Sequence, residues 1–240
     1  MNLLIDSGNT STKAAIYQYG KAITFFKPFS FEEIEKIKLN YSISRVIISS
    51  VNKDYDTLKA SLPDSLECII LTSDTPLPVR VNYSTPQTLG PDRIAAACGA
   101  HLHYPDQHCL IIDAGTCITY DFLHRTEGYL GGSISPGIEM RFKALNAYTS
   151  RLPLLQKTIR TPLTGKNTEQ SILSGVLNGV LQEAKGIITE YQLLYNPLKI
   201  IVTGGDTDFF ETNLKPTIFA IPNLVFDGLN SILEYNVHKV

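Results

Sequence analysis

The sequence lacks both long apolar segments and clusters of basic residues. No stretch reaches the ~18 consecutive apolar residues of a membrane-spanning helix, and no run of lysine or arginine occurs. The 21 basic and 23 acidic side chains leave a formal net charge of -2. Because proteins that bind nucleic acid usually carry a concentrated basic surface, we expect no nucleic-acid partner. We expect no membrane partner either.

Cysteine is scarce, and its spacing does not suggest a metal site. Cys68, Cys98, Cys109 and Cys117 form no C-x-x-C pair, and no histidine–cysteine cluster has the spacing of a zinc site. Reduced, buried thiols are therefore expected, as in cytosolic proteins. Residues 1–6 contain no basic region, and their apolar run is too short for a signal peptide. A cytoplasmic protein fits these features.

The sequence has the composition of a globular protein and a repeated plan. Hydrophobic residues make up 43% and charged residues 18% of the 240 residues. In each half, a β-meander precedes alternating helices and strands, which predicts an α/β fold with two lobes facing one cleft. We expect the lobes to span residues 1–105 and 106–240. The predicted strands are residues 2–6, 11–19, 22–29, 45–51, 67–71, 108–114, 116–123, 128–135, 199–203 and 217–221. The predicted helices are residues 31–37, 55–62, 91–104, 137–147, 168–195, 208–213 and 224–235.

Two similar turns occupy matching places in the two halves. The first is Asp6-Ser7-Gly8-Asn9-Thr10-Ser11-Thr12, followed by Lys13, and the second is Asp113-Ala114-Gly115-Thr116-Cys117-Ile118-Thr119. Glycine lets a phosphate approach the backbone, whose N–H groups form an anion-binding nest. The aspartate can hold a hydrated cation. Either turn alone is as easily a polar hairpin, but two at matching places favour phosphate binding.

A third turn follows a buried strand near the C-terminus. The run Thr203-Gly204-Gly205-Asp206 leaves a backbone without side chains that can face a purine and ribose. The alternative is an ordinary strand-to-helix turn that Asp206 caps. The sequence contains neither the G-x-x-x-x-G-K-[ST] motif of a P-loop nor the G-x-G-x-x-G fingerprint of a dinucleotide-binding fold. Neither motif therefore offers an alternative to the three turns as the nucleotide-binding site.

In this order, the three turns resemble those of the actin-like ATPase superfamily. The segments Asp6–Thr10, Gly90–Arg93, Asp113–Thr116 and Gly131–Gly137 look more narrowly like type III pantothenate kinase, and the resemblance runs over nearly the whole chain. The sequence departs from the family at Pro91, where a small residue is more frequent. It also departs at Ile94, where an aromatic residue is frequent. Both positions bear on how the helix at Asp92 begins.

The resemblance implies a fold, a reaction and its partners. The fold would be two ribonuclease-H-like lobes facing a central cleft. The reaction would be ATP-dependent phosphorylation of pantothenate to 4'-phosphopantothenate, the first step of coenzyme A biosynthesis. The family also implies Mg²⁺ with the ATP, a monovalent cation (K⁺ or NH₄⁺) and a homodimer.

The resemblance assigns roles to individual residues. Asp92 would be the catalytic base, Asp113 would hold the monovalent cation, and Asp6 would lie near magnesium. The implied ATP-binding residues are Asp6, Ser7, Gly8, Asn9, Thr10, Ser11, Thr12, Lys13 and Thr116. The implied pantothenate-binding residues are Tyr83, Gly90, Pro91, Asp92, Arg93 and Thr168. Thr168 would contact the pantothenate bound to its own subunit or the one bound to the second subunit of the dimer.

Each of these residues also has a plainer interpretation. Asp92 in the first turn of a helix can simply stabilise the helix start, by ~0.3–1 kcal/mol. Arg93 can be a surface arginine, and Tyr83 a buried aromatic residue. The small residues Ser171, Gly175 and Gly179 allow close helix packing, either in a dimer or within one subunit. Residues 143–164 are either a mobile loop over the site or a connection.

Two other functions use the same motifs. A kinase for another small alcohol, such as a sugar, usually has a longer chain with insertions. A nucleotide-dependent regulator would not need a carboxylate such as Asp92 beside the γ-phosphate.

Overall fold

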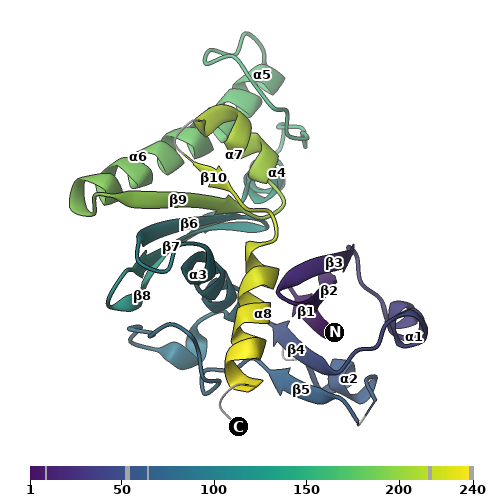
Figure 1. The fold of residues 1–240 in the computed structure, drawn as a ribbon. Helices are drawn as coiled ribbons and strands as arrows, with labels where there is room; N and C mark the ends of the chain where they lie inside the picture. The colour runs from purple at the N-terminus through teal and green to yellow at the C-terminus, as the bar shows by residue number, and fades with distance from the viewer. Residues whose placement is uncertain (9, 52–54, 64, 216–217, 238–240) are drawn as a thin grey trace. The chain divides into compact units, whose positions relative to one another are not determined.

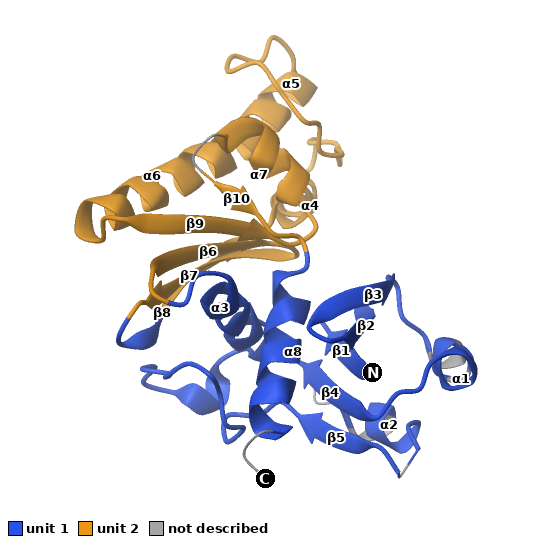
Figure 2. Cartoon of the chain, in the orientation of Figure 1, with its two compact units in different colours: residues 1–105, 126–130, 223–240 blue, residues 106–125, 131–222 orange. Residues whose placement is uncertain are grey.

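The chain folds into two compact units, each built on one five-stranded sheet (Figure 1). The computed structural model describes residues 1–8, 10–51, 55–63, 65–215 and 218–237. Unit 1 comprises residues 1–105, 126–130 and 223–240, and unit 2 comprises residues 106–125 and 131–222 (Figure 2).

The sheet of unit 1 has the strand order β3-β2-β1-β4-β5. β1 pairs antiparallel with β2 and parallel with β4, and β4 pairs parallel with β5. Apolar side chains of α1 and α2, such as Ile34 and Leu58, pack with Ile5 and Ile48 in one core. α3 and α8 pack together, and both contact β4. The elements are β1 (Asn2–Ser7), β2 (Thr12–Gln18), β3 (Lys21–Phe26), α1 (Phe31–Asn40), β4 (Arg45–Ser50), α2 (Tyr55–Ala60), β5 (Glu67–Ile70), a 3₁₀ turn η1 (Pro86–Thr88), α3 (Pro91–His103) and α8 (Leu224–Val237).

Unit 2 repeats this strand order, as β8-β7-β6-β9-β10. β6 pairs antiparallel with β7 and parallel with β9, and β9 pairs parallel with β10. The repeat predicted from the two turns is therefore confirmed. The elements are β6 (His108–Ala114), β7 (Cys117–His124), β8 (Gly128–Pro136), α4 (Ile138–Ala147), α5 (Thr168–Leu173), the π-helical turn η2 (Ser174–Asn178), α6 (Gly179–Leu194), β9 (Leu198–Thr203), α7 (Thr207–Leu214) and β10 (Phe219–Ala220).

Each predicted strand and helix has a counterpart, with two notable differences. The helix predicted over residues 168–195 is interrupted by the π-helical turn η2. The strand predicted over residues 217–221 is reduced to Phe219–Ala220, and residue 217 lies outside the described part of the chain.

The last helix belongs to the first unit. The sequence division at residue 105 placed α8 in the second lobe, whereas α8 packs on α3 in unit 1. A side chain at Gly228 would overlap the backbone of Ala95, and one at Gly99 would overlap the backbone of Leu224. Both glycines therefore permit a close approach of the two helices.

No helix in the described ranges combines the length and the apolar character of a membrane-spanning segment.

Candidate active site

The first turn of the sequence is the tip of the β1–β2 hairpin in unit 1. Asp6 pairs with Lys13 and Ser7 with Thr12, so both ends of the motif lie side by side. The N–H of Gly8 donates to the carbonyl of Ser11 (3.2 Å), and the hydroxyls of Ser7 and Thr12 are 3.0 Å apart. Thr10 and Ser11 are exposed at the tip, and Asn9 lies outside the described residues.

Asp6 lies at the base of this turn with its carboxylate largely removed from solvent. Burial raises its pKa from 3.8 to about 6, and the negative charge of Asp92 adds to the increase. The charge of Lys13 and a hydrogen bond from the Ser49 hydroxyl (3.2 Å) oppose it. The two carboxylates predicted for metal binding and base catalysis therefore interact electrostatically within unit 1.

Asp92 is held in the first turn of α3, which begins at Pro91. Proline suits the first helical position because a backbone N–H at that position has no acceptor within the helix, so its absence costs no hydrogen bond. A side chain at Gly90 would overlap the Asp92 carboxylate, so glycine at this position lets the carboxylate keep its observed place. The backbone N–H of Arg93 donates to the Asp92 carboxylate (2.9 Å). Arg93 itself is only 7% exposed, so it is not the surface arginine of the plainer interpretation.

Tyr83 lies on the segment that leads from β5 to α3. This segment meets the start of β8, where the N–H of Asn82 donates to the carbonyl of Tyr129 (2.8 Å). The rings of Tyr83 and Tyr129 are 6.2 Å apart at 51°. Tyr83 is half-buried, and its contact with a substrate stays a prediction.

The second turn of the sequence is the tip of the β6–β7 hairpin in unit 2. The N–H of Gly115 donates to the carbonyl of Cys117 (2.9 Å), and that of Gly137 donates to the carbonyl of Thr116 (3.1 Å). A side chain at Gly137 would overlap the carbonyl oxygens of Gly115 and Thr116. The end of the Gly131–Gly137 segment thus packs directly on the turn. Thr116 is exposed, and Asp113 is half-buried.

The third turn packs against the second. Gly204 has φ +94°, and a side chain there would overlap the Asp113 carboxylate and the Ala114 carbonyl. The N–H of Asp206 donates to the Ala114 carbonyl (2.9 Å). Asp206 precedes α7 but caps it with no side-chain hydrogen bond, and its carboxylate pairs with Lys157 instead. Asp206 therefore occupies the N-cap position of α7, as the alternative predicted, but its side chain makes no capping hydrogen bond.

Thr168 is the first residue of α5 and is exposed. The Asn167 side chain caps this helix by accepting from the N–H of Gln170 (2.9 Å). The preceding loop is fixed at several points: the Ser174 hydroxyl donates to the Leu163 carbonyl (2.5 Å), and the Asn213 amide donates to the Ile159 carbonyl (3.1 Å). Most of the stretch 143–164 is thus a hydrogen-bonded connection in this structure, and its start belongs to α4.

The side chains of Ser49 and Lys157 contact residues of the candidate turns, and neither was predicted from the sequence. Ser49 donates to Asp6, and its only sequence signal is the pair of serines that ends an apolar strand. Lys157 pairs with Asp206, but it lies in a loop with no pattern of its own. Both contacts depend on strand or loop placement that local sequence does not specify.

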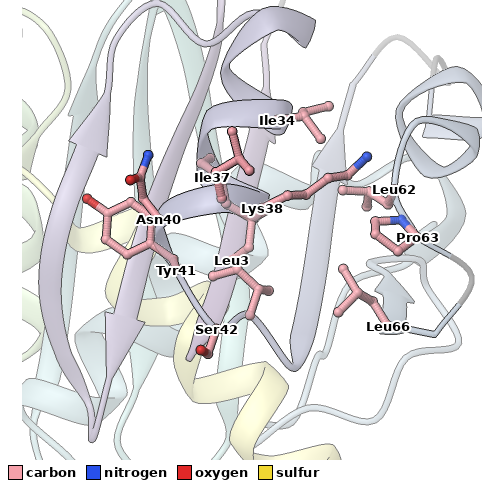
Figure 3. A pocket seen from close by; sticks show the side chains of 12 residues that line it. Leu3, Ile34, Ile37, Lys38, Asn40, Tyr41, Ser42, Leu62, Pro63 and Leu66 are labelled. Atoms are coloured by element: carbon pink, nitrogen blue, oxygen red, sulfur yellow. The ribbon is translucent and has the colours of Figure 1, made fainter.

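Described residues of unit 1 line a cavity at each of two opposite edges of its sheet. One of about 580 Å³ lies at the carboxyl ends of β4 and β5, beside Gly90 and Pro91. The other, of about 360 Å³, lies where the strands begin, and Lys38, Tyr41 and Leu66 are among its lining residues (Figure 3). Only the first adjoins the candidate catalytic residues.

The carboxylates fit a hydrated cation better than a site made of protein ligands alone. Among the described residues, no group of three or more histidine, cysteine, aspartate or glutamate side chains could hold a metal. Magnesium is usually held by one or two carboxylates together with water and substrate phosphates. The repulsion between Asp6 and Asp92 is the kind of interaction that such a cation relieves.

Comparison with known proteins identifies relatives along the whole chain. A family model described as type III pantothenate kinase matches residues 2–190. A type III pantothenate kinase of Christiangramia forsetii is 45% identical over 240 residues, which cover 98% of this chain and 99% of the relative. One of Cytophaga hutchinsonii is 43% identical over 239 residues, which cover 99% of this chain and 100% of the relative.

Solved structures support the fold. A Campylobacter jejuni protein described as a Baf family transcriptional activator has a TM-score of 0.67 at 23% identity, covering 98% of this chain and 99% of that chain. The activator of 2-hydroxyisocaproyl-CoA dehydratase from Clostridium difficile, with bound ADPNP, has a TM-score of 0.54 at 13% identity, covering 100% and 97%. At these identities the likeness shows the fold alone, that of two ribonuclease-H-like, actin-like lobes.

Proposed function

This chain belongs to the type III pantothenate kinase family, and from that premise we propose how its residues phosphorylate pantothenate with ATP. The reaction transfers the γ-phosphoryl group to the primary hydroxyl of pantothenate and yields 4'-phosphopantothenate for coenzyme A biosynthesis.

The observation that carries the proposal is the electrostatic coupling of Asp6 and Asp92. Asp6 ends the strand that leads into the phosphate turn, and Asp92 opens α3. Phosphoryl transfer has a loose transition state, so catalysis is mostly positioning and charge neutralisation. One carboxylate that orients the acceptor hydroxyl and takes its proton suffices as base. We assign this role to Asp92, whose position at a helix N-terminus favours its ionised form.

Nucleotide binding is assigned to residues of both units. The exposed hydroxyls and backbone N–H groups of the β1–β2 turn are suited to phosphate oxygens, and Lys13 adds a positive charge. In unit 2, Thr116 is assigned nucleotide binding as well. Gly204 and Gly205 present backbone without side chains, and a Cβ at Gly205 would meet nothing within 4 Å, which suits a flat base.

Pantothenate binding is assigned to Tyr83, to the segment from Gly90 to Arg93 and to Thr168. The buried Arg93 guanidinium can pair with the pantothenate carboxylate. Two cations complete the assignment. Asp6 would hold hydrated Mg²⁺, which neutralises phosphate charge when bound. Asp113 would hold K⁺ or NH₄⁺, since carbonyl oxygens such as those of Gly115 and Thr116 lie at the same turn and carbonyl oxygens can replace the hydration shell of K⁺.

We also propose a homodimer in the cytoplasm. Ser171, Gly175 and Gly179 are exposed along one helical stripe, and a Cβ at either glycine would meet nothing within 4 Å. The small residues are therefore available for close packing with a second subunit, with Thr168 at the start of the same helical segment. The four cysteines are free thiols, as expected in a reducing compartment.

An acceptor panel tests the proposal. ATP consumption is measured with pantothenate, glucose, acetate or no acceptor, with and without K⁺. Pantothenate alone should raise turnover, and K⁺ should increase it further. Stimulation by glucose instead would favour a sugar kinase, and no stimulation by any acceptor would favour a nucleotide-dependent regulator.

A further inference from the structure

Arg141 of α4 links three elements of unit 2. Its Nε donates to the carbonyl of Pro136 (2.8 Å), and its Nη2 donates to the Ser135 hydroxyl (2.8 Å) and to the Glu183 carboxylate (2.6 Å). Ser135 and Pro136 end β8, and Glu183 lies in α6. One guanidinium therefore ties the end of a strand to two helices.

The carboxylate of Glu183 is held at both of its oxygens. The hydroxyl of Tyr120 in β7 donates to Oε1 (3.1 Å), while Arg141 donates to Oε2. The side chains of Arg141 and Glu183 are 23% and 28% exposed, so water screens this pair less than it screens ion pairs on the open surface. Burial by itself raises the pKa of Glu183, whereas hydrogen bonds and the Arg141 charge lower it overall. The pair is thus a charged, hydrogen-bonded anchor for the guanidinium.

Gly137 follows Pro136 and packs on the second turn of the sequence. Its N–H donates to the carbonyl of Thr116 (3.1 Å), and a side chain there would overlap the carbonyl oxygens of Gly115 and Thr116. Pro136 has no N–H and can donate no hydrogen bond to a sheet, but the guanidinium holds its carbonyl. Arg141 therefore fixes the residue immediately before the one that packs on the Thr116 turn.

We propose that Arg141 is a positioning residue for nucleotide binding. Its guanidinium holds Pro136 in place, Pro136 places Gly137, and Gly137 sets the conformation of the turn that carries Thr116. Glu183 orients the guanidinium. A lysine at this position would keep the charge, but it would offer one nitrogen instead of a planar fork that reaches three acceptors. The inference rests on the proposed function, because it takes Thr116 as a nucleotide-binding residue.

Arg141→Lys tests the proposal on the full-length enzyme, by calorimetry with the non-hydrolysable ATP analogue ADPNP in the absence of pantothenate. The Kd for ADPNP should rise about tenfold, the scale of one lost hydrogen bond to a charged group, and the KM for ATP should rise with it. The KM for pantothenate should stay unchanged, because Tyr83 and Gly90–Arg93 belong to unit 1. An arginine with a structural role alone would lower the melting temperature and leave the Kd for ADPNP unchanged.

A double-mutant cycle with Thr116→Ala shows whether Arg141 acts through this turn. In the Thr116→Ala background, adding Arg141→Lys should raise the Kd for ADPNP far less than it does in the wild-type background, because the contact that Arg141 positions is already lost. Equal increases in the two backgrounds would overturn the proposed route.

Lys143→Ala is the matched control, because Lys143 lies on the same helix and forms an exposed ion pair with Glu139 (2.8 Å). It should change neither the Kd for ADPNP nor either KM. Glu183→Gln is the second variant, in case Arg141→Lys does not fold. It keeps the shape of the side chain but removes the charge that pairs with the guanidinium, so the Kd for ADPNP should rise.

The outcomes separate the role of Arg141 from the proposed function. If the wild type binds ADPNP and phosphorylates pantothenate, but both variants of the ion pair keep the wild-type Kd, the positioning role is overturned and the proposed function stands. If the wild type binds ADPNP but does not phosphorylate pantothenate, the proposed function fails, and the Kd values still decide the role of Arg141. A wild type that binds no ADPNP would overturn both.

Discussion

Asp6→Asn tests whether the buried carboxylate at the end of β1 is electrostatically unfavourable in the substrate-free protein. Asparagine has nearly the same shape, and its side-chain oxygen can still accept the hydrogen bond from Ser49. The substitution removes the charge that burial and Asp92 disfavour. The free energy of unfolding at pH 7.5 should therefore increase, while phosphoryl transfer is lost because the proposed cation ligand is gone.

The pKa of Asp6 sets the size and the sign of the effect. Its carboxyl ionises near 3.8 in the unfolded chain and near 6 in the folded one, a difference that corresponds to about 3 kcal/mol. Below pH 3.8 the Asp6 carboxyl is protonated in both the folded and the unfolded chain, so its ionisation does not lower the stability of the fold. As the pH rises through this window the wild type loses stability, and the full cost is present above pH 6. Asp6→Asn has no carboxyl to ionise and should not lose this stability. Its free energy of unfolding should therefore exceed that of the wild type by up to about 3 kcal/mol at pH 7.5 and by little at pH 4.

Urea denaturation at pH 4 and pH 7.5 measures the effect for the wild type and the variant. Asp106→Asn is the control, because Asp106 is exposed in the loop before β6, and it should change stability by less than about 0.5 kcal/mol at either pH. The reasoning is refuted if Asp6→Asn is no more stable than the wild type at pH 7.5, or if its gain is equal at both pH values.

Three further substitutions test other parts of the site. Asp92→Asn should lower kcat by at least ~100-fold, the usual scale for losing a general base, while calorimetry still detects ATP binding; undiminished turnover would remove Asp92 from the mechanism. Asp113→Ala should abolish stimulation by K⁺ and NH₄⁺ in the turnover assay, and an active variant that still responds to these ions would count against that cation site. Gly204→Ala should destabilise the protein by ~1–3 kcal/mol in urea denaturation, because φ is +94° and its Cβ would overlap Asp113 and Ala114. Gly205→Ala is the matched control, since a Cβ there meets nothing within 4 Å; equal losses in the two variants would show that the close approach at Gly204 is unimportant.

Local sequence patterns predicted most of the fold. Alternation of apolar residues located the strands, and proline after Gly90 located the start of α3. These signals act over a few residues, so a single sequence contains them. The turns at Asp6 and Asp113 were visible for the same reason, because each follows an apolar strand directly.

Features that depend on distant segments could not be predicted. The hydrogen bond from Ser49 to Asp6 exists because β4 pairs with β1, and strand pairing is set by the whole sheet. The π-helical turn from Ser174 inserts one extra residue into the helical repeat, and the sequence there still has ordinary helical spacing. The Ser50 hydroxyl, which is buried without a hydrogen-bond partner among the described residues, is likewise a property of the folded environment.

The position of α8 has a consequence for how the protein is made. Ribosomes synthesise chains from the N-terminus at ~5–20 residues per second, yet unit 1 needs α8, which follows all of unit 2 in the sequence. Until Leu224–Val237 has emerged, the surface of α3 around Gly99 has no partner helix. The first unit should therefore be unable to complete its folding until α8 has been synthesised, after the whole of unit 2.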